Sequence, residues 1–169
     1  DLMYEAGFRQ ILIGFESGSE RMLTNMQKGA TVAQNTRCVT ILHDRGIQMK
    51  ALMSLGHPGE SPETVQATRE WLLAVQPDDF DLTVITPYPG SPYFDEAMKN
   101  VDGSYTYTAK SGDALHMTDV DHLSDVTFYK GIPGEYHSFV WTDALSREAM
   151  VASRDWVESD VRERLGIAY

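Results

Sequence analysis

Short apolar runs alternate with segments of helical periodicity over the first hundred residues of the chain. The apolar runs, typical of buried strands, are at residues 8–15, 48–55 and 80–86. The segments of helical periodicity are at residues 20–27, 31–46, 61–75 and 91–100. This alternation favours a parallel sheet with right-handed crossovers, so we predict an α/β fold. Because all three runs are largely apolar, we expect both faces of the sheet to be covered.

Local signals predict where several of these helices begin and end. Thr31 and Gln34 have the spacing of a capping box. Ser61 followed by Pro62 is a typical N-cap and first helical residue. Gly29 stands where it would end the helix at residues 20–27. These signals support separate short helices between the strands.

The pattern changes after residue 100. Residues 103–113 are typical of a strand-turn excursion, and residues 135–141 alternate as a strand does. Residues 145–165 predict an amphipathic helix, in which Val157, Val161 and Leu165 recur at every fourth position. We therefore predict two parts: the α/β unit at residues 1–100, and an α+β C-terminal extension at residues 101–169 that packs on the sheet.

Composition restricts the partners and the compartment. The chain has 169 residues, which suits one domain, and a formal net charge of −11. Nucleic acid and anionic membranes are disfavoured as partners, because both select a basic face. The single cysteine, Cys38, cannot form an internal disulfide, and its helical spacing from Ile41 and Leu42 indicates an inert thiol on the core side. We expect a cytoplasmic protein and, because the chain opens without methionine, a piece of a longer polypeptide.

Candidate chemistry gathers where the predicted strands end, the edge at which α/β sheets place ligands. Glu16 ends the first strand and is followed by Ser17 and Gly18. An acid at the start of a helix often only complements the helix dipole. It can also accept hydrogen bonds from a diol such as a ribose, while small neighbours let a ligand approach the backbone. Position alone leaves both interpretations open for Glu16.

Lys28 and the two later strand ends supply further candidate groups. Lys28 is suited either to complement a helix end or to pair with a ligand carboxylate. The second strand continues into a tight loop that contains Leu55, Gly56, Pro58 and Gly59. His57, in the same loop, is interpreted as a solvated side chain. Ile85 and Thr86 end the third strand, where their backbone groups could bond a planar base.

Three segments stand at these strand ends: GFESGSERMLTNMQKGATVAQ, GIQMKALMSLGHPGESPETVQAT and VITPYPGSPYFDEA. In this order and spacing they resemble the second half of radical S-adenosylmethionine (SAM) enzymes. The resemblance covers about residues 1–97. It is to the class of Fe–S oxidoreductases that often have a cobalamin-binding domain, which includes methyltransferases and the anaerobic magnesium-protoporphyrin ester cyclase. The segment DVTFYKGIPGEYHSFVWTDALS is more weakly similar to the tail of some members.

The resemblance implies a fold and a set of cofactor-binding residues. The fold would be a partial, open TIM-like barrel of parallel strands, of which this chain holds the C-terminal half. Glu16, beside Ser17 and Gly18, would bind the ribose of SAM, and Lys28 would pair with its carboxylate. The remaining contacts, beside or on the adenine, would come from Leu55, Gly56, Pro58, Gly59, Ile85 and Thr86. His57 stands where the family pattern has a leucine.

The cysteine motif of this family is absent from the chain. Such enzymes hold a [4Fe–4S] cluster through Cys-x-x-x-Cys-x-x-Cys, and one cysteine cannot replace three thiolates. We expect a radical SAM parent, an oxidoreductase or transferase whose cluster ligands lie outside this fragment, with cobalamin an open possibility. The fragment alone is expected to hold no metal ligands or catalytic residues and to be inactive. Without the N-terminal half-barrel, its exposed strand edge should favour self-association.

Two other functions stay open at this point. A non-catalytic barrel that binds a nucleotide or a protein would use Glu16 and Lys28 without any cluster. A phosphate-binding barrel would place an anion at residues 56–59, although Glu16 is a poor neighbour for phosphate. The sequence predicts neither the small-molecule substrate nor the reaction type.

Overall fold

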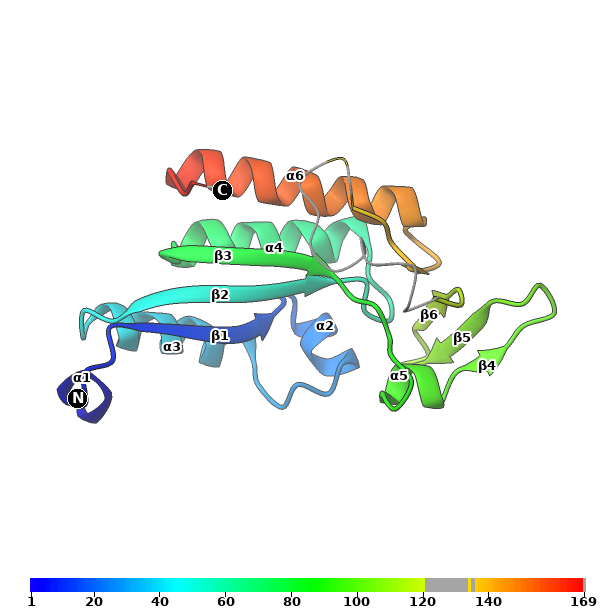
Figure 1. The fold of residues 1–169 in the computed structure, drawn as a ribbon, viewed down its shortest axis with the longest axis horizontal. Coiled ribbons are helices and arrows are strands. Elements are labelled where there is room, and N and C mark those ends of the chain that lie inside the picture. Colours follow the sequence, from blue (N-terminus) through cyan, green and yellow to red (C-terminus); the bar gives the residue numbers. More distant parts are fainter. Residues whose placement is uncertain (121–133, 135, 169) are drawn as a thin grey trace.

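The computed structural model describes residues 1–120, 134 and 136–168, which form two sheets and the helices around them (Figure 1). The helices are α1 (Leu2–Glu5), α2 (Glu20–Asn25), α3 (Val32–His43), α4 (Pro62–Val75), α5 (Pro92–Asp95) and α6 (Arg147–Leu165). The strands are β1 (Gln10–Glu16), β2 (Gln48–Leu55), β3 (Asp79–Val84), β4 (Met98–Lys99), β5 (Tyr105–Thr108), β6 (Ala114–Met117) and β7 (Val140–Trp141).

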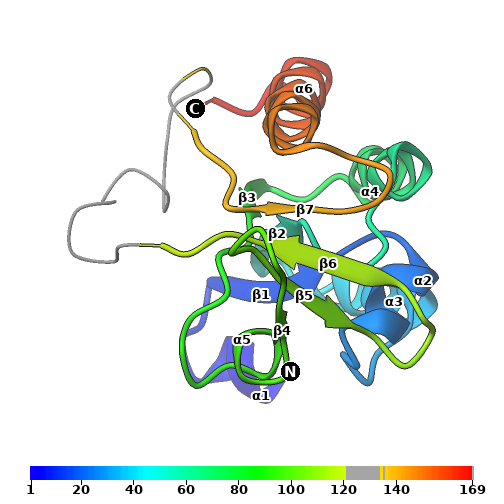
Figure 2. The ribbon, with the colours of Figure 1, turned by 90° about the vertical axis from the view of Figure 1, so that its right-hand side faces the viewer.

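The predicted α/β fold is confirmed as a parallel sheet in the order β1-β2-β3. Helices α2, α3 and α4 lie on one side of this sheet, and α6 lies beyond β3 (Figure 2). The antiparallel sheet β4-β5-β6-β7 lies beyond the carboxyl ends of the parallel strands (Figure 1). The predicted partial barrel goes beyond these three strands and stays a prediction.

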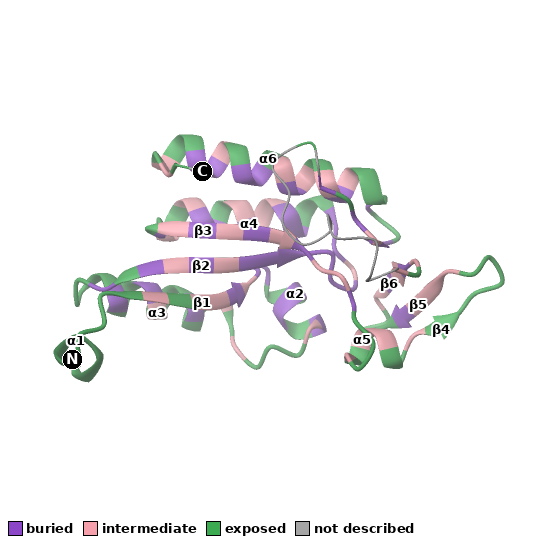
Figure 3. Ribbon diagram, in the orientation of Figure 1, coloured by how far each residue is buried: buried purple, intermediate pink, exposed green. Residues whose placement is uncertain are grey.

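The expectation that both faces of the sheet are covered is wrong for the described residues. The β2 face that packs toward the helices contains Met49, Ala51 and Met53, which are buried, whereas Lys50 on the other face is partly exposed (Figure 3). β3 alternates polar and apolar residues, so its open face presents Asp79, Asp81 and Thr83. Lys50 Nζ lies 2.8 Å from an Asp79 oxygen and 3.0 Å from an Asp81 oxygen. The open face is therefore polar along β3 and at Lys50, whereas Leu12 and Leu52 give it apolar surface beside them.

Most helix signals are confirmed, and one is corrected. The capping boxes at the starts of α3 and α4 both form. However, α2 ends at Asn25, before the predicted Gly29, because Gln27 adopts the left-handed conformation with φ 53°. The Lys28 N–H then donates to the Leu23 carbonyl at 3.0 Å, which closes the helix as a Schellman motif. Lys28 thus follows the helix end rather than lying in its last turn.

The region after α5 differs from its prediction in detail. The helix predicted up to residue 100 stops at Asp95, and β4 follows it. β5 and β6 pair as a hairpin, which confirms the strand-turn excursion. Of the strand predicted at residues 135–141, only Val140–Trp141 forms β7, and Glu135 lies outside the described residues. α6 confirms the predicted C-terminal helix, which packs on α4 and β3. One apolar cluster joins the extension to the sheet, with Leu115, Val140 and Val157 beside Leu55 and Phe80.

Helix α6 covers the free edge of β3 with three buried charged side chains. Glu158 Oε1 accepts the Leu82 N–H at 2.7 Å, and Arg154 Nε donates to the Leu82 carbonyl at 2.9 Å. Arg162 donates to the Phe80 carbonyl and pairs with Glu158. Unpaired backbone groups on a sheet edge invite pairing with another chain. The helix therefore satisfies the edge of β3 at Phe80 and Leu82 in place of a fourth strand, and the Tyr136 hydroxyl bonds the backbone of Val84.

Substitution of Glu158 by alanine should strongly destabilise the fold. It leaves the Leu82 N–H and the Arg162 guanidinium without their buried acceptor, and breaking such a pair costs about 3 kcal/mol or more. The measurement is the free energy of unfolding from urea titration. Arg164→Ala is the control, because Arg164 pairs with Asp160 on the same helix while 59% exposed, so its loss should cost about 0.5 kcal/mol. Equal effects of the two substitutions would show that the edge contacts add nothing.

Candidate functional site

A cavity of about 510 Å³ opens on the uncovered face of the parallel sheet, toward the carboxyl ends of its strands. It is lined by Leu12, Gly14, Glu16, Leu52, Met53, Asp81, Thr83, Val84, Ile85, Thr86, Tyr88 and Tyr136. Three of the predicted site residues, Glu16, Ile85 and Thr86, are among them. The structure thus brings the ends of β1 and β3 to one cavity.

The backbone at the end of β1 takes an unusual conformation that places Glu16. The φ of Glu16 is 68°, which is uncommon for a residue other than glycine. The Ser17 N–H donates to the Phe15 carbonyl at 2.9 Å, which closes a tight turn with Glu16 at its centre. A β-bulge between Gly14 and Glu16 accompanies this turn. A Cβ on Gly14 would lie 2.5 Å from Glu16 Oε1, so this position needs glycine for the carboxylate to fold back over the strand. Strained backbone of this kind is typical of ligand sites.

The Glu16 carboxylate has two partners, one on each oxygen. Lys28 Nζ lies 3.0 Å from Oε1, and the Ser54 hydroxyl donates to Oε2 at 2.8 Å. The Glu16 and Lys28 side chains are 29% and 33% exposed, whereas Ser54 is buried. The two residues predicted as separate ligand groups are therefore in direct contact with each other. An ion pair this exposed contributes little to stability, on the order of 0–1 kcal/mol.

Ser17 and Gly18 face helix α4. The Ser17 hydroxyl lies 3.0 Å from Thr68 Oγ1, and the Gly18 N–H donates to the same oxygen at 3.1 Å. A Cβ on Gly18 would lie 2.5 Å from Trp71 Cβ, so only glycine fits between β1 and α4. These contacts fix the turn that follows Glu16, and a direct contact of either residue with a ligand stays a prediction.

The loop after β2 is covered by the C-terminal extension. The Gly59 N–H donates to the Ala114 carbonyl at 3.1 Å, and the Pro58 carbonyl accepts from Asn25 Nδ2 at 2.7 Å. A Cβ on Gly59 would lie 2.6 Å from Asp113 Cγ. Leu55 and Gly56 precede these residues and are buried, so this loop supports the cavity from behind and does not line it.

Asp113, in the turn between β5 and β6, ties the extension to α2. Its carboxylate accepts hydrogen bonds from Arg21 and, at 2.8 Å, from Asn25. These hydrogen bonds, led by that from Arg21, lower the pKa of Asp113 to about 2. The hairpin is therefore anchored by a charge at all but strongly acidic pH.

His57 is buried, which contradicts its interpretation as a solvated side chain. Its exposed fraction is 7%. Nε2 lies 2.8 Å from Ser54 Oγ, and Nδ1 lies 3.2 Å from the Tyr93 hydroxyl. Burial lowers the pKa of His57 to about 4, so the ring is neutral at pH 7.

Glu60 is a second buried titratable group in the same loop. Its carboxyl accepts the Gly56 N–H at 3.1 Å and the Thr64 hydroxyl, while its carbonyl accepts from Thr142 Oγ1 at 2.7 Å. Burial raises the pKa of Glu60 to about 7. Glu60 therefore joins the loop to the start of α4 and to the extension.

The pKa shifts of His57 and Glu60 should have opposite effects on stability. His57, lowered from 6.5 to about 4, contributes stability that is present above pH 6.5 and lost as the pH falls toward 4. Glu60, raised from 4.5 to about 7, contributes stability that is present below pH 4.5 and lost as the pH rises toward 7. Each contribution amounts to about 3 kcal/mol, so in the intact chain they nearly cancel.

Substitution of either group should make the pH dependence of stability that the other contributes measurable. The free energy of unfolding of His57→Gln, relative to the wild type, should increase as the pH falls from 6.5 to 4.5. The free energy of unfolding of Glu60→Gln, relative to the wild type, should decrease over the same pH range. The change is about 3 kcal/mol for each variant. Urea titrations across this range provide the measurement, and the double variant is the control that should lose both trends. Parallel profiles for both single variants and the wild type would contradict the assigned shifts.

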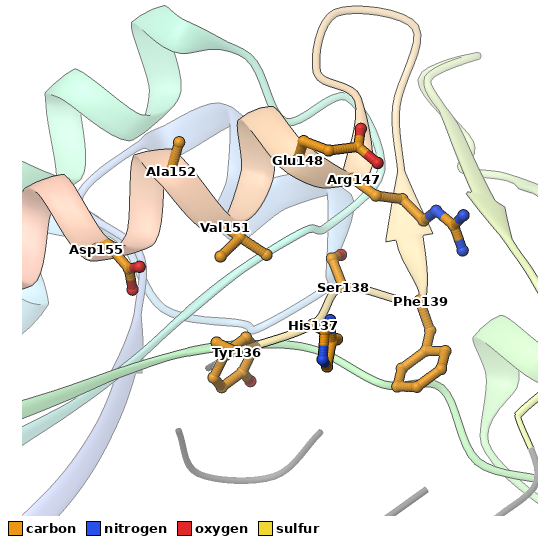
Figure 4. Close-up of a pocket in the computed structure, with 9 residues that line it drawn as sticks. All are labelled: Tyr136, His137, Ser138, Phe139, Arg147, Glu148, Val151, Ala152 and Asp155. Atoms are coloured by element: carbon orange, nitrogen blue, oxygen red, sulfur yellow. The ribbon is translucent and has the colours of Figure 1, made fainter. Parts of the chain in front are cut away.

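A further cavity of about 560 Å³ lies between the segment at residues 136–139 and helix α6 (Figure 4). Its helical side is formed by Arg147, Glu148, Val151, Ala152 and Asp155. Asp155 accepts from Arg154, and Glu148 accepts from Ser146, so both acids have partners within the protein. The predicted site residues do not line this cavity, which adds no chemistry to the site.

The sequence analysis missed several residues that shape the site. Gly14 was visible as a glycine within an apolar strand, which marks a close approach of the backbone. Ser54 was visible as one hydroxyl within the run ALMSLG. Glu60 and Asp113 had no comparable signal, because their roles arise from contacts between segments distant in the sequence.

Within the part of the chain that the structure describes, no group of three or more His, Cys, Asp or Glu side chains is placed to hold a metal ion. No helix in the same residues is long and apolar enough to cross a membrane.

The chain is similar in sequence to several curated proteins, although no protein-family model matches it. The bacteriochlorophyllide d C-12(1)-methyltransferase of Chlorobaculum tepidum is 30% identical over 102 residues, which are 60% of this chain and 22% of that protein. The anaerobic magnesium-protoporphyrin IX monomethyl ester cyclase of Rubrivivax gelatinosus is 30% identical over 101 residues, again 60% of this chain and 18% of the relative. The chain thus spans about a fifth of the length of these relatives.

A solved structure shares the fold. The radical SAM methyltransferase TsrM from Kitasatospora setae, with cobalamin and a [4Fe–4S] cluster bound, matches 65% of this chain and 23% of its own. The TM-score is 0.52 at 24% sequence identity, so this match concerns the fold alone. The resemblance that the three motifs indicate is thus confirmed as a similarity: the chain is similar in sequence to part of a methyltransferase and of a cyclase, and similar in fold to part of a radical SAM methyltransferase.

Proposed function

We propose that this chain is the SAM-binding part of a radical SAM enzyme that depends on a [4Fe–4S] cluster. The observation that supports this most directly is the Glu16 carboxylate, held over Gly14 at the edge of a cavity between parallel strand ends, with Lys28 beside it. The relatives are methyltransferases and cyclases, which supports an oxidoreductase or transferase parent.

The residues present fit SAM in chemistry and arrangement. A SAM molecule needs an acceptor for its ribose hydroxyls, a cation for its carboxylate and an apolar wall with backbone groups for its adenine. Glu16 and Lys28 supply the first two, and Leu12 and Leu52 give the cavity apolar surface. The missing Cβ of Gly14 leaves room for the carboxylate to turn toward the cavity.

The ion pair between Glu16 and Lys28 suits exchange for a ligand. Because both side chains are about one-third exposed, breaking their contact costs on the order of 1 kcal/mol or less. Glu16 would then accept the ribose hydroxyls, and Lys28 would turn to the SAM carboxylate. The Ile85 N–H already donates to the Leu55 carbonyl at 2.9 Å. Contact with adenine would therefore use the Ile85 carbonyl or the backbone of Thr86.

We propose that the other predicted site residues act indirectly, by supporting the turn after Glu16 and the wall of the cavity. Ser17 and Gly18 fix the turn after Glu16, through their contacts with α4. Leu55, Gly56, Pro58 and Gly59 form the buried loop behind the cavity. Any approach of this loop to the adenine would be through its surface next to Ile85.

The chemistry itself requires groups from outside this chain. When bound, the cluster of a radical SAM enzyme supplies the electron that cleaves SAM. Cys38, the one cysteine of this chain, cannot provide three thiolate ligands, so we propose that they come from an N-terminal half-barrel in a cytoplasmic parent protein. Cobalamin, present in the TsrM structure, is a candidate second cofactor of the parent. On this proposal the isolated chain is inactive.

Glu16→Gln and Lys28→Met should each weaken SAM binding by about tenfold. Each removes one charge-assisted contact with the ligand, and such contacts contribute about 1.5–3 kcal/mol. The measurement is calorimetric titration of SAM into the 169-residue chain, with urea titration to verify that the variants fold. Glu163→Gln and Lys110→Met, two exposed positions away from the cavity, are the matched controls.

Unchanged SAM affinity in Glu16→Gln would show that the ribose contact is wrong. The alternative of a non-catalytic, nucleotide-binding or protein-binding barrel predicts that a longer parent protein lacks a cluster. Anaerobic reconstitution of that parent with iron and sulfide, followed by absorption spectroscopy and SAM titration, separates this alternative from the enzyme.

We also propose that the isolated chain self-associates through β1. This strand is an edge of the parallel sheet, and Leu12 on it is 57% exposed. Light scattering at increasing protein concentration should detect dimers or larger species. Leu12→Lys should shift the equilibrium toward monomer, because a charge on an edge strand opposes pairing. A strictly monomeric wild-type chain at high concentration would contradict this proposal.

A further inference from the structure

A continuous set of hydrogen bonds leads from the interior of the protein to the Glu16 carboxylate. The Tyr93 hydroxyl lies 3.2 Å from His57 Nδ1, and His57 Nε2 lies 2.8 Å from Ser54 Oγ. Ser54 Oγ in turn lies 2.8 Å from Glu16 Oε2. Ser54 and His57 are 6% and 7% exposed, so water does not compete freely for these contacts.

The chemistry of these groups determines which atom donates in each hydrogen bond. A carboxylate only accepts, so the Ser54 hydroxyl donates its single hydrogen to Glu16. Ser54 Oγ can then only accept from His57, which requires the hydrogen of the neutral imidazole to be on Nε2. Nδ1 is left as the acceptor, and the Tyr93 hydroxyl donates to it. Burial, which keeps His57 neutral at pH 7, agrees with this assignment.

We propose that Tyr93, His57 and Ser54 form a directional relay that positions the Glu16 carboxylate for the ribose of SAM. This inference rests on the proposed function, which it deepens by naming positioning residues behind the ligand contact. The two oxygens of Glu16 then differ in kind. Oε1 is held by the partly exposed Lys28 and is released to the ligand, whereas Oε2 keeps its buried bond to Ser54.

The conformation of Glu16 explains why such an anchor is needed. With a φ of 68° at a bulge, the residue is in a strained turn whose side chain could relax once Lys28 turns away. A fixed hydrogen bond to one oxygen preserves the orientation of the other. The relay is itself held by packing, because the Tyr93 ring contacts Tyr107 of β5 with 4.9 Å between ring centroids. The extension thereby supports the carboxylate from behind.

The first test is the tautomer of His57 in the 169-residue chain without any ligand. Nitrogen-15 NMR of the imidazole distinguishes a protonated from an unprotonated ring nitrogen, and His57→Gln assigns the signals. The expected result at pH 7 is a neutral ring with hydrogen on Nε2. Hydrogen on Nδ1, or a charged ring, would overturn the relay independently of SAM.

The second test compares the SAM affinity of matched variants by calorimetric titration. Ser54→Ala and His57→Leu remove a donor of the relay and should each weaken binding by about tenfold. His57→Gln retains an N–H near the position of Nε2 and should restore affinity to within about twofold of the wild type. A merely structural histidine would not show this rescue. His43→Leu is the control, because His43 pairs with Asp78 outside the cavity.

The outcomes separate the relay from the proposed function. SAM binding that is unaffected by Ser54→Ala and His57→Leu, in variants that urea titration shows to be folded, would overturn the relay alone. Equal losses in His57→Leu and His57→Gln would do the same. No SAM binding by the wild-type chain would overturn the proposed function, and the positioning role with it.

Discussion

The unsatisfied backbone of a parallel sheet is the constraint on which this structure depends. Three parallel strands leave an edge on each side, and each edge presents N–H and C=O groups that need partners. At β3 the partners come from α6, where Glu158, Arg154 and Arg162 bond the backbone of Leu82 and Phe80. Because those side chains project from a helix, they satisfy the strand without adding another strand. The sheet therefore ends at β3, and its carboxyl edge stays open to a ligand.

Burying three charged side chains on one helix face, where they bond the edge of β3, costs free energy of desolvation unless the charges also pair with one another. Glu158 does so by receiving both the Leu82 N–H and the Arg162 guanidinium. This arrangement binds the extension to the α/β unit through polar contacts in addition to their shared apolar core. It explains how a three-stranded sheet can have one face that the described residues leave open and still be stable, since its stability comes from the helical side and from one edge.

The sequence predicted what depends on local patterns and failed where distant segments meet. The three parallel strands, the capping box at Thr31, the N-cap at Ser61 and α6 follow from periodicity and N-cap residues, which act within a few positions. The end of α2 was misplaced because Gln27 adopts a conformation for which glycine is the usual signal. His57 was misjudged for a different reason: a loop is solvated by default, whereas this side chain is buried against Ser54 on β2 and Tyr93 on α5. Glu16 could be predicted from its place at a strand end, whereas its contact with the Ser54 hydroxyl joins two strands and could not be predicted from either one alone.

The position of His57 shows how the extension and the site depend on each other. A leucine at this position would fill the same buried space without any polar requirement. A histidine there needs hydrogen-bond partners for both ring nitrogens. A buried polar group without partners costs more free energy than its packing contributes. Its partners are Ser54 on β2 and Tyr93 on α5. Because Ser54 also bonds Glu16, this histidine links the burial of the loop to the orientation of the Glu16 carboxylate. A change in the packing of the extension on Tyr93 would therefore reach Glu16 through hydrogen bonds, without any movement of the sheet.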